Sequence, residues 1–166
     1  MFSISLANGD ETTFDQLVKL HDATDLNEER VRIYRSLGGG KTDQLTTRCL
    51  EFSLSDKARP GDAWYLLFSA AHASPRAREM VWSFVREKWA LLTERYKGMF
   101  LITRIVDIAT AGFVTEEKAQ EVEQFFKDNP CAMAERVVKQ NCEAIRVNAK
   151  WLQRDTQAVK EWLSTQ

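Results

Sequence analysis

The positions of glycine and proline restrict the fold of this chain more than any other feature of its sequence. They fall between segments in which apolar residues recur every three or four positions, and never inside such a segment. In a helix interior, Gly costs about 1 kcal/mol and Pro about 3 kcal/mol relative to Ala, so their exclusion marks the helices. The residues concerned are Gly9, Gly38, Gly39, Gly40, Gly61, Gly98, Gly112, Pro60, Pro75 and Pro130.

No long segment alternates apolar and polar residues with a period of two, so we expect an all-α fold without a sheet. Helical hairpins are expected to begin near residues 11, 41, 74 and 115. This spacing of roughly 30–40 residues is typical of a HEAT or armadillo array. The sequence therefore predicts that residues 1–166 form a single helical domain, a HEAT/armadillo-like solenoid of about eight or nine helices.

Local signals predict where individual helices begin and end. Helices are expected to start at Thr42 and at Ser74-Pro75, Thr115 is expected to cap a later helix, and Asp25 is expected to cap the helix that precedes Gly38. Gly38 is expected to end that helix in the left-handed conformation. The predicted helices start at or next to Asp10, Asp25, Thr42, Pro60, Ser74, Met99, Thr115, Pro130 and Asp155.

Apolar residues at helical spacing are expected to form the core. The helix that follows Ser74 is predicted to continue unbroken as far as Leu92, and the helix capped by Thr115 to bury Phe125 and Phe126. We also expect most tryptophans to be buried. The tryptophans are Trp64, Trp82, Trp89, Trp151 and Trp162.

Composition excludes several classes of partner and compartment. The net charge of −1 favours neither nucleic acid nor an anionic membrane, and no window approaches eighteen apolar residues. Three cysteines make no even disulfide framework, which indicates a reducing compartment. We therefore expect a cytoplasmic protein that binds neither nucleic acid nor membrane.

The residue types needed for catalysis are sparse. The chain has only His21 and His72, with no His-Glu-x-x-His pair, no Cys-x-x-Cys pair and no Gly-x-Ser-x-Gly elbow. We expect no catalytic residue and no metal site in this chain.

The most promising chemistry lies around the Gly98 turn, where Arg95, Tyr96, Lys97 and Arg104 are close in sequence. A partly desolvated guanidinium is a good carboxylate ligand, so these four residues are candidates for peptide binding. The alternative is structural: Arg104 would form a salt bridge to a neighbouring helix, for example to Asp107 or Glu135.

Motifs around the same turn resemble the C-terminal region of the puromycin-sensitive aminopeptidase family, which are zinc-dependent aminopeptidases of the gluzincin class. The motifs are Lys88-Trp89, Arg95-Tyr96-Lys97-Gly98 and Phe100-Leu101-Ile102-Thr103-Arg104. The resemblance extends, in order, from Asn8–His21 to Asn148–Asp155. It departs from the family pattern at Met99, where relatives tend to have a second Gly.

This resemblance implies a parent enzyme that removes residues from peptide N-termini, with its zinc ion in a separate catalytic domain. The present chain would be the distal part of the C-terminal helical domain, a HEAT-like superhelix. It would contact the catalytic domain of the same polypeptide, wall the substrate chamber, and touch peptide C-termini through the four residues named above. The zinc-binding and substrate-amine motifs of the family do not occur in this chain.

A hypothesis from another class remains open at this point. The chain could be a free-standing HEAT-like adaptor that binds protein partners through a groove or an exposed apolar patch. An adaptor would exist alone in cells, whereas a domain of an aminopeptidase would be part of a much longer polypeptide.

Overall fold

The computed structural model describes residues 9–165, and in that part of the chain it contains nine α-helices and no strand, which confirms the all-α prediction. None of these helices combines the length and the apolar character needed to cross a membrane. The chain divides into two compact units, Met1–Ala109 and Thr110–Gln166. The helices are α2 (Glu11–Ala23), α3 (Asn27–Leu37), α4 (Asp43–Leu54), α5 (Trp64–Ala73), α6 (Pro75–Glu87), α7 (Trp89–Arg95), α8 (Leu101–Thr110), α9 (Glu116–Asp128) and α10 (Glu135–Ser164).

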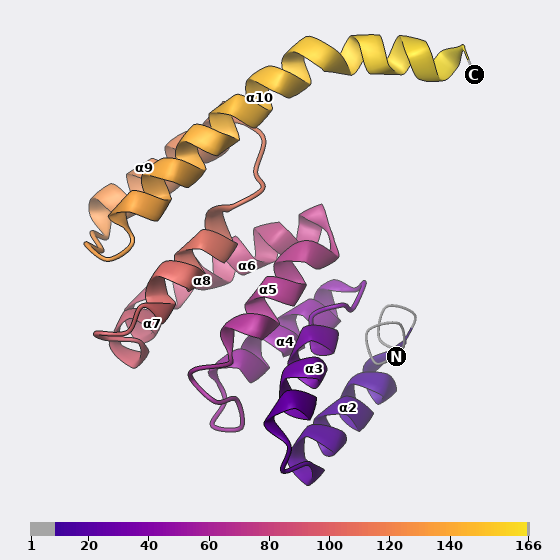
Figure 1. The fold of residues 1–166 in the computed structure, drawn as a ribbon, viewed down its shortest axis with the longest axis vertical. Helices are drawn as coiled ribbons and strands as arrows, with labels where there is room; N and C mark the ends of the chain where they lie inside the picture. Colours follow the sequence, from indigo (N-terminus) through magenta and orange to yellow (C-terminus); the bar gives the residue numbers. More distant parts are fainter. Residues whose placement is uncertain (1–8, 166) are drawn as a thin grey trace. The chain divides into compact units, whose positions relative to one another are not determined.

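In the first unit, helices stack on one another in a regular pattern (Figure 1). Helix α3 packs on α5 and α4 packs on α6, so a helix contacts the second helix along the chain as well as its sequence neighbour. This is the contact pattern of a two-helix solenoid. The buried side chains that fill the stack include Phe14, Leu17, Ile33, Tyr34, Leu37, Leu45, Cys49, Leu66, Leu67, Val81, Trp82, Val85 and Leu92.

The cap predicted at Thr115 and the helix starts predicted at Thr42 and Ser74 are confirmed by hydrogen bonds. The Thr42 hydroxyl accepts from the Leu45 N–H at 3.2 Å, and the Ser74 hydroxyl accepts from the Ala77 N–H at 3.0 Å. Thr115 accepts from the N–H of the third residue after it, at 3.3 Å. Each bond satisfies one of the unpaired donors of a helix start, which is why these residue types mark the boundaries.

The predicted cap at Asp25 is wrong. Helix α3 begins after Leu26, whose side chain makes no capping bond. The preceding Thr24 organises this turn instead, because its hydroxyl accepts from the Leu26 N–H and donates to Glu29. The next predicted start is also displaced: α5 begins at Trp64, and Pro60 lies in the turn that precedes it.

The role predicted for Gly38 is wrong as well. Its φ is −79°, so it does not adopt the left-handed conformation. A Cβ atom at this position would lie 1.9 Å from Ser69 Oγ and 2.4 Å from the Ala70 nitrogen, so glycine allows α3 to approach the backbone of α5 closely. The left-handed glycines are Gly98 and Gly112, with φ of 73° and 77°.

Two predicted helix boundaries differ from the structure. The helix after Ser74 is interrupted at Lys88, whose φ of −99° and ψ of 14° end α6 before α7 starts. Conversely, Asp155 caps no separate helix and lies within the 30-residue α10. Its carboxylate is paired with the guanidinium of Arg154 at 2.8 Å, so it is not used as a backbone cap.

The second unit is a helical hairpin in which α9 runs antiparallel to the first half of α10 (Figure 1). A small set of side chains is buried there, comprising Ala119, Val122, Val138, Cys142 and Ile145. Phe125 and Phe126 are only half-buried, contrary to expectation, and their rings meet edge to face at 5.1 Å. The second half of α10 continues beyond the N-terminal end of α9.

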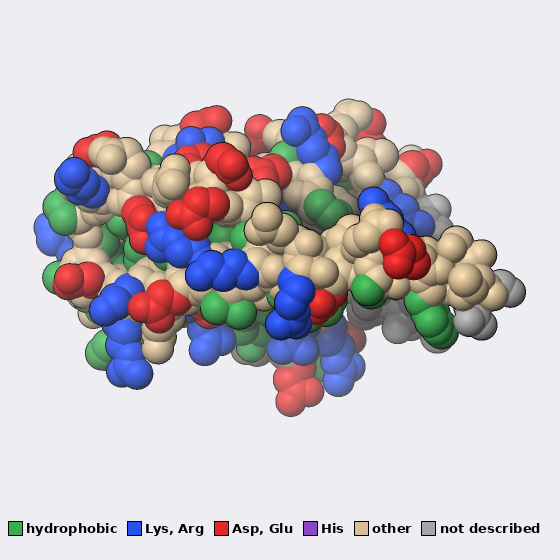
Figure 2. Space-filling view, turned by 90° about the horizontal axis from the view of Figure 1, so that it is seen from above, with side chains coloured by type: hydrophobic (Ala, Val, Ile, Leu, Met, Phe, Trp, Pro, Cys, Tyr) green, Lys and Arg blue, Asp and Glu red, His purple; other side chains and the backbone are tan. Residues whose placement is uncertain are grey.

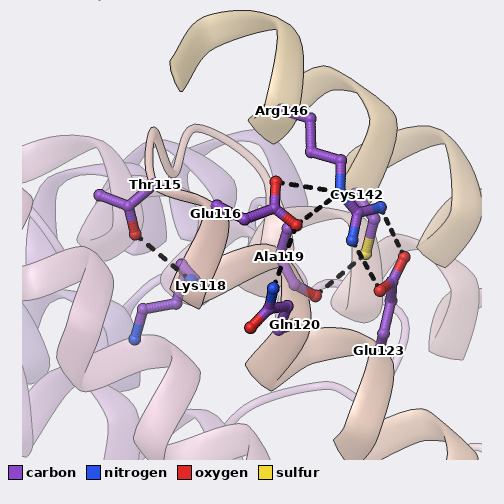
Figure 3. A network of polar contacts seen from close by, with 8 residues as sticks. All are labelled: Thr115, Glu116, Lys118, Ala119, Gln120, Glu123, Cys142 and Arg146. Carbon is purple, nitrogen blue, oxygen red and sulfur yellow. Dashed lines mark hydrogen bonds and ion pairs between the residues drawn. The ribbon is translucent and has the colours of Figure 1, made fainter. Parts of the chain in front are cut away.

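Arg146 on α10 links the two helices of this hairpin through hydrogen bonds to α9 (Figure 3). Its Nε donates to Glu116 at 3.0 Å and its terminal nitrogens donate to both carboxylate oxygens of Glu123 at 2.7 Å. Hydrogen bonds from this guanidinium lower the pKa of Glu123 below its usual value. The bidentate geometry fixes the register of α10 on α9.

Candidate functional site

The most distinctive surface of the first unit is a row of rings along α5. Trp64 and Tyr65 have ring centres 3.7 Å apart, Trp64 and Phe68 are 6.3 Å apart with their rings nearly perpendicular, and Phe68 and His72 are 4.3 Å apart. We call Trp64, Tyr65, Phe68 and His72 the α5 aromatic row. Its members are half-buried or exposed, whereas Leu66, Leu67, Ala70 and Ala71 on the same helix are buried.

Two arginines from neighbouring helices lie over this row. The guanidinium carbon of Arg104, on α8, lies 4.3 Å from the centre of the Trp64 ring, and that of Arg35, on α3, lies 4.7 Å from the centre of the Tyr65 ring. Each contact is a cation–π interaction. A guanidinium that stacks through its flat face keeps its N–H donors directed outward at its edge, where they can bind a planar anion.

The four residues singled out from the sequence do not form one cluster. Arg95 is turned towards the end of α4, where its guanidinium donates to the carbonyl oxygens of Leu54 at 2.6 Å and of Ser55 and Ala58 at 3.3 Å. Tyr96 is buried, and burial raises the pKa of its hydroxyl. Arg95 therefore fixes the end of α7 against the end of α4, and Tyr96 is part of the core.

The other two predicted residues are exposed. Lys97 is paired with Glu94, one turn earlier, at 3.6 Å. Arg104 contacts Trp64 as described, and among residues 9–109 its guanidinium forms no ion pair. The Gly98 turn thus separates two arginines that serve different elements: Arg95 binds backbone carbonyls, and Arg104 lies at the surface beside the aromatic row.

This arrangement suits non-covalent binding of an extended chain. Half-exposed rings offer apolar area at a low cost in side-chain entropy, and the two guanidiniums offer hydrogen-bond donors for carboxylates. Figure 2, seen from the side of α10, shows Lys and Arg side chains intermixed with Asp and Glu side chains there, in keeping with the net charge of −1.

The nucleophilic and titratable groups of the interior are enclosed. Cys49 and Cys142 are buried and donate to the carbonyls of Leu66 and Ala119, and burial raises both thiol pKa values, that of Cys142 to about 11. The buried His21 lies with its Nε2 2.9 Å from the hydroxyl of Tyr34, which is also buried. These groups stabilise the core and are closed to a substrate.

Sequence reasoning missed Arg35 and the α5 aromatic row. A signal was present: Trp64, Phe68 and His72 follow one another at intervals of four residues, while Leu67 and Ala71 follow the same interval on another face. Two apolar stripes on one helix exceed what a single core contact can bury. The second stripe in the sequence could therefore have indicated an exposed apolar surface on this helix.

The family model and the relatives found by comparison with known proteins point to the same family. The model of the ERAP1-like C-terminal domain matches residues 1–147. The chain is 33% identical over 144 residues to Aminopeptidase M1 of Arabidopsis thaliana, which covers 87% of this chain and 16% of the relative. It is 33% identical over 140 residues to Aminopeptidase M1-A of Oryza sativa subsp. japonica, covering 84% and 16% respectively.

A mammalian relative aligns over a longer part of the chain. Identity to Endoplasmic reticulum aminopeptidase 2 of Bos taurus is 26% over 170 residues, which covers 99% of this chain and 18% of the relative. The chain therefore spans about a sixth of the length of the curated relatives it matches.

Proposed function

Because this chain belongs to the family of ERAP1-like C-terminal domains, we propose that it is a non-catalytic part of a zinc-dependent aminopeptidase. The parent enzyme removes residues one by one from peptide N-termini, and residues 1–166 form the distal part of its C-terminal, HEAT-like domain. The aminopeptidase names of these relatives support this assignment. The resemblance to aminopeptidases found in the sequence motifs is confirmed at the level of the family.

The zinc ion of this proposal belongs to the catalytic domain of the same polypeptide. Within residues 9–165, no three His, Cys, Asp or Glu side chains gather in a way that could hold a metal ion. The described residues therefore do not fit a zinc site. We propose that the chain contacts the catalytic domain and the peptide substrate. The three cysteines form no disulfide with one another and are in keeping with a cytoplasmic location.

Our proposal that this domain forms part of the wall of the substrate chamber rests on the α5 aromatic row. A wall that guides peptides of varied sequence needs apolar contact without a deep, selective pocket, and half-exposed rings provide such contact. The row lies on α5, whose other residues Leu66, Leu67, Ala70 and Ala71 are buried and which packs on α3, α4 and α6, so the position of the row is well supported. The domain would thus act on peptide access and positioning, and the chemistry would take place elsewhere in the parent.

We assign the peptide carboxylate to Arg104. Its guanidinium is exposed and lies over the Trp64 ring, 4.3 Å from the ring centre, which leaves its N–H donors available to a carboxylate. Lys97 adds a second exposed cation beyond the Gly98 turn. Arg95 and Tyr96 act as positioning residues, because their contacts hold the end of α7 and the turn that leads to α8.

The test compares peptides that differ only in a free or an amidated C-terminus. Calorimetric titration of the 166-residue chain should give tighter binding for the free carboxylate, and Arg104→Gln should remove that preference. A hydrogen bond to a charged group contributes about 1.5–3 kcal/mol, so the expected loss is on the order of tenfold or more in Kd. Arg76→Gln is the matched control, because Arg76 is an exposed arginine on α6 that is paired with Asp43.

A second readout uses the full-length parent enzyme and a series of peptide lengths. The proposal expects Arg104→Gln to alter the dependence of trimming on peptide length and to leave hydrolysis of a single aminoacyl substrate unchanged. Equal binding of free and amidated peptides by the unaltered chain would overturn the assignment of Arg104. Hydrolysis of an aminoacyl substrate by the isolated chain would overturn the non-catalytic role.

A further inference from the structure

The second half of α10 carries an apolar stripe that α9 does not cover. Trp151 and Trp162 are 53% and 61% exposed, and Leu152 and Leu163 are 37% and 60% exposed. Val159 lies between these pairs and is also exposed. Tryptophan is seldom left so open on a helix without a partner, and a continuous stripe of this kind marks an interaction surface.

The stripe is built from a repeat. The dipeptide Trp-Leu occurs at positions 151–152 and again at 162–163, eleven residues later. Eleven residues make slightly more than three turns, so both tryptophans lie along one edge of the stripe and both leucines along the other. The two Trp-Leu pairs are about 16 Å apart along the helix axis. A helix that presents the same pair twice on one face is complementary to a copy of itself that runs in the opposite direction.

We propose that this stripe is an interface between two copies of the chain, in which the second halves of their α10 helices pack antiparallel about a two-fold axis near Gln157. A two-fold axis at this point sets each Trp-Leu pair against the other Trp-Leu pair of the second copy. Tryptophan then meets tryptophan on one edge and leucine meets leucine on the other. Ala158, a small residue close to the axis, allows the helices to approach.

Charge and area both permit this pairing. Two acidic residues lie between the Trp-Leu pairs, Asp155 and Glu161. The Asp155 carboxylate is already bound by Arg154 at 2.8 Å, and Glu161 is exposed on the side of the helix away from the stripe, where it accepts a hydrogen bond from Gln157, so the pairing buries no uncompensated charge. The exposed fractions leave roughly 600 Å² of apolar surface on each copy, so that two copies bury on the order of 1,200 Å², the lower end of specific interfaces. A reversible dimer is the expected result.

Sedimentation equilibrium of the 166-residue chain over a range of concentrations tests the pairing. The proposal expects a species of twice the 19.1 kDa chain mass at the higher concentrations. Trp162→Glu should leave the helix content unchanged and raise the dissociation constant at least tenfold. Phe100→Glu is the control, because Phe100 is the most exposed large apolar residue of the described chain, at 85%, and lies outside the stripe.

Cysteine cross-linking tests the direction of the pairing. The background is Cys131→Ser, which removes the native thiol that is only half-buried. Ala158→Cys should form a disulfide between copies, because the two positions meet at the axis. Asn148→Cys lies on the same face but about 27 Å from its counterpart in an antiparallel pair, so it should not cross-link.

Three outcomes overturn the proposal. The first is a monomer at every concentration, which would result if another part of the parent polypeptide covers the stripe. The second is a dimer that Trp162→Glu leaves intact. The third is cross-linking of Asn148→Cys that equals that of Ala158→Cys. The last would indicate parallel pairing or non-specific association. These results do not depend on peptide binding by Arg104, so the two proposals stand or fall separately.

Discussion

The two units of this chain stabilise their helices in different ways. In the first unit, α3, α4, α5 and α6 are each in contact with at least two other helices, and Trp82 and Tyr34 are fully buried among them. In the second unit, α10 is more than twice as long as its partner α9, and only the first half of α10 contributes buried residues. A stack covers its own apolar surface, whereas an unequal hairpin leaves surface for a partner.

The same contrast appears in two arginines. Arg95 binds three backbone carbonyls near the end of α4 and is half-buried, so it closes a helix end inside the stack. Arg146 binds two exposed glutamates and joins two helices at the surface. The first arrangement satisfies groups that water cannot easily reach, and the second competes with water throughout. The difference predicts how strongly each unit responds to substitution.

The largest contrast is expected between two tryptophans. Trp82→Ala removes a fully buried side chain and should lower the free energy of unfolding of the first unit by about 3–5 kcal/mol. Trp162→Ala should change the stability of an isolated chain little, because that side chain is already exposed. Urea unfolding followed by tryptophan fluorescence reports mainly on the first unit, where the buried Trp82 and Trp89 lie. Equal losses for the two variants would contradict the contrast.

Close approach of helices in the first unit should make it intolerant of an added methyl group. Gly38→Ala places a Cβ atom within 1.9 Å of Ser69 Oγ and 2.4 Å of a backbone nitrogen of α5, so α3 and α5 must separate. The expected loss is about 1–3 kcal/mol by the same unfolding assay. Gly61→Ala is the matched control, because its Cβ would meet no atom within 4 Å, and it should be nearly neutral.

Substitution of Arg95 should lower the unfolding free energy of the first unit, because the carbonyls that it binds lose a donor. Arg95→Met keeps much of the aliphatic stem but leaves the carbonyls of Leu54, Ser55 and Ala58 without this donor. We expect a loss of about 2 kcal/mol in the unfolding free energy of the first unit. A loss no greater than that of a surface substitution such as Lys97→Met would show that water replaces the guanidinium.

The smallest effect is expected for Arg146→Met, and it should depend on pH. Arg146 lowers the pKa of Glu123 from its ordinary value near 4.5, so this contact stabilises the folded hairpin fully above that pH. As the pH falls below about 4.5 and through the folded pKa, Glu123 takes up a proton and the contribution is lost. The difference between the unaltered chain and the variant, measured by circular dichroism during urea unfolding, should therefore shrink in acid. A difference that grows in acid would contradict this assignment.

The sequence predicted those features that depend on local chemistry. Helix starts at Thr42, Ser74 and Thr115 were identified, and there a hydroxyl three residues before an N–H is sufficient to satisfy it. The cap predicted at Asp25 was wrong because Thr24 and Glu29 organise that turn instead. The break at Lys88 has no Gly or Pro to signal it, and the continuity of α10 through Asp155 depends on the pairing of that side chain with Arg154.

The candidate site was predicted only in part. Arg104 was identified, but its contact with Trp64 joins residues 40 positions apart, and no local pattern reveals such a contact. Arg95 was grouped with it because the two are close in sequence, yet the Gly98 turn directs them to different helices. The exposure of Trp151 and Trp162 was likewise missed, because helical spacing shows that a stripe exists and not whether another helix covers it.

Amide hydrogen exchange of the 166-residue chain tests most directly whether the two units bind different partners. It should be measured below and above the concentration at which the chain associates, and again with a peptide that has a free C-terminus. The account predicts slow exchange of the first unit throughout, with further protection of α5 and α8 when peptide is added. It also predicts that residues 148–164 exchange quickly in dilute solution and slowly in concentrated solution. Protection of residues 148–164 that does not change with concentration, or peptide protection outside α5 and α8, would contradict it.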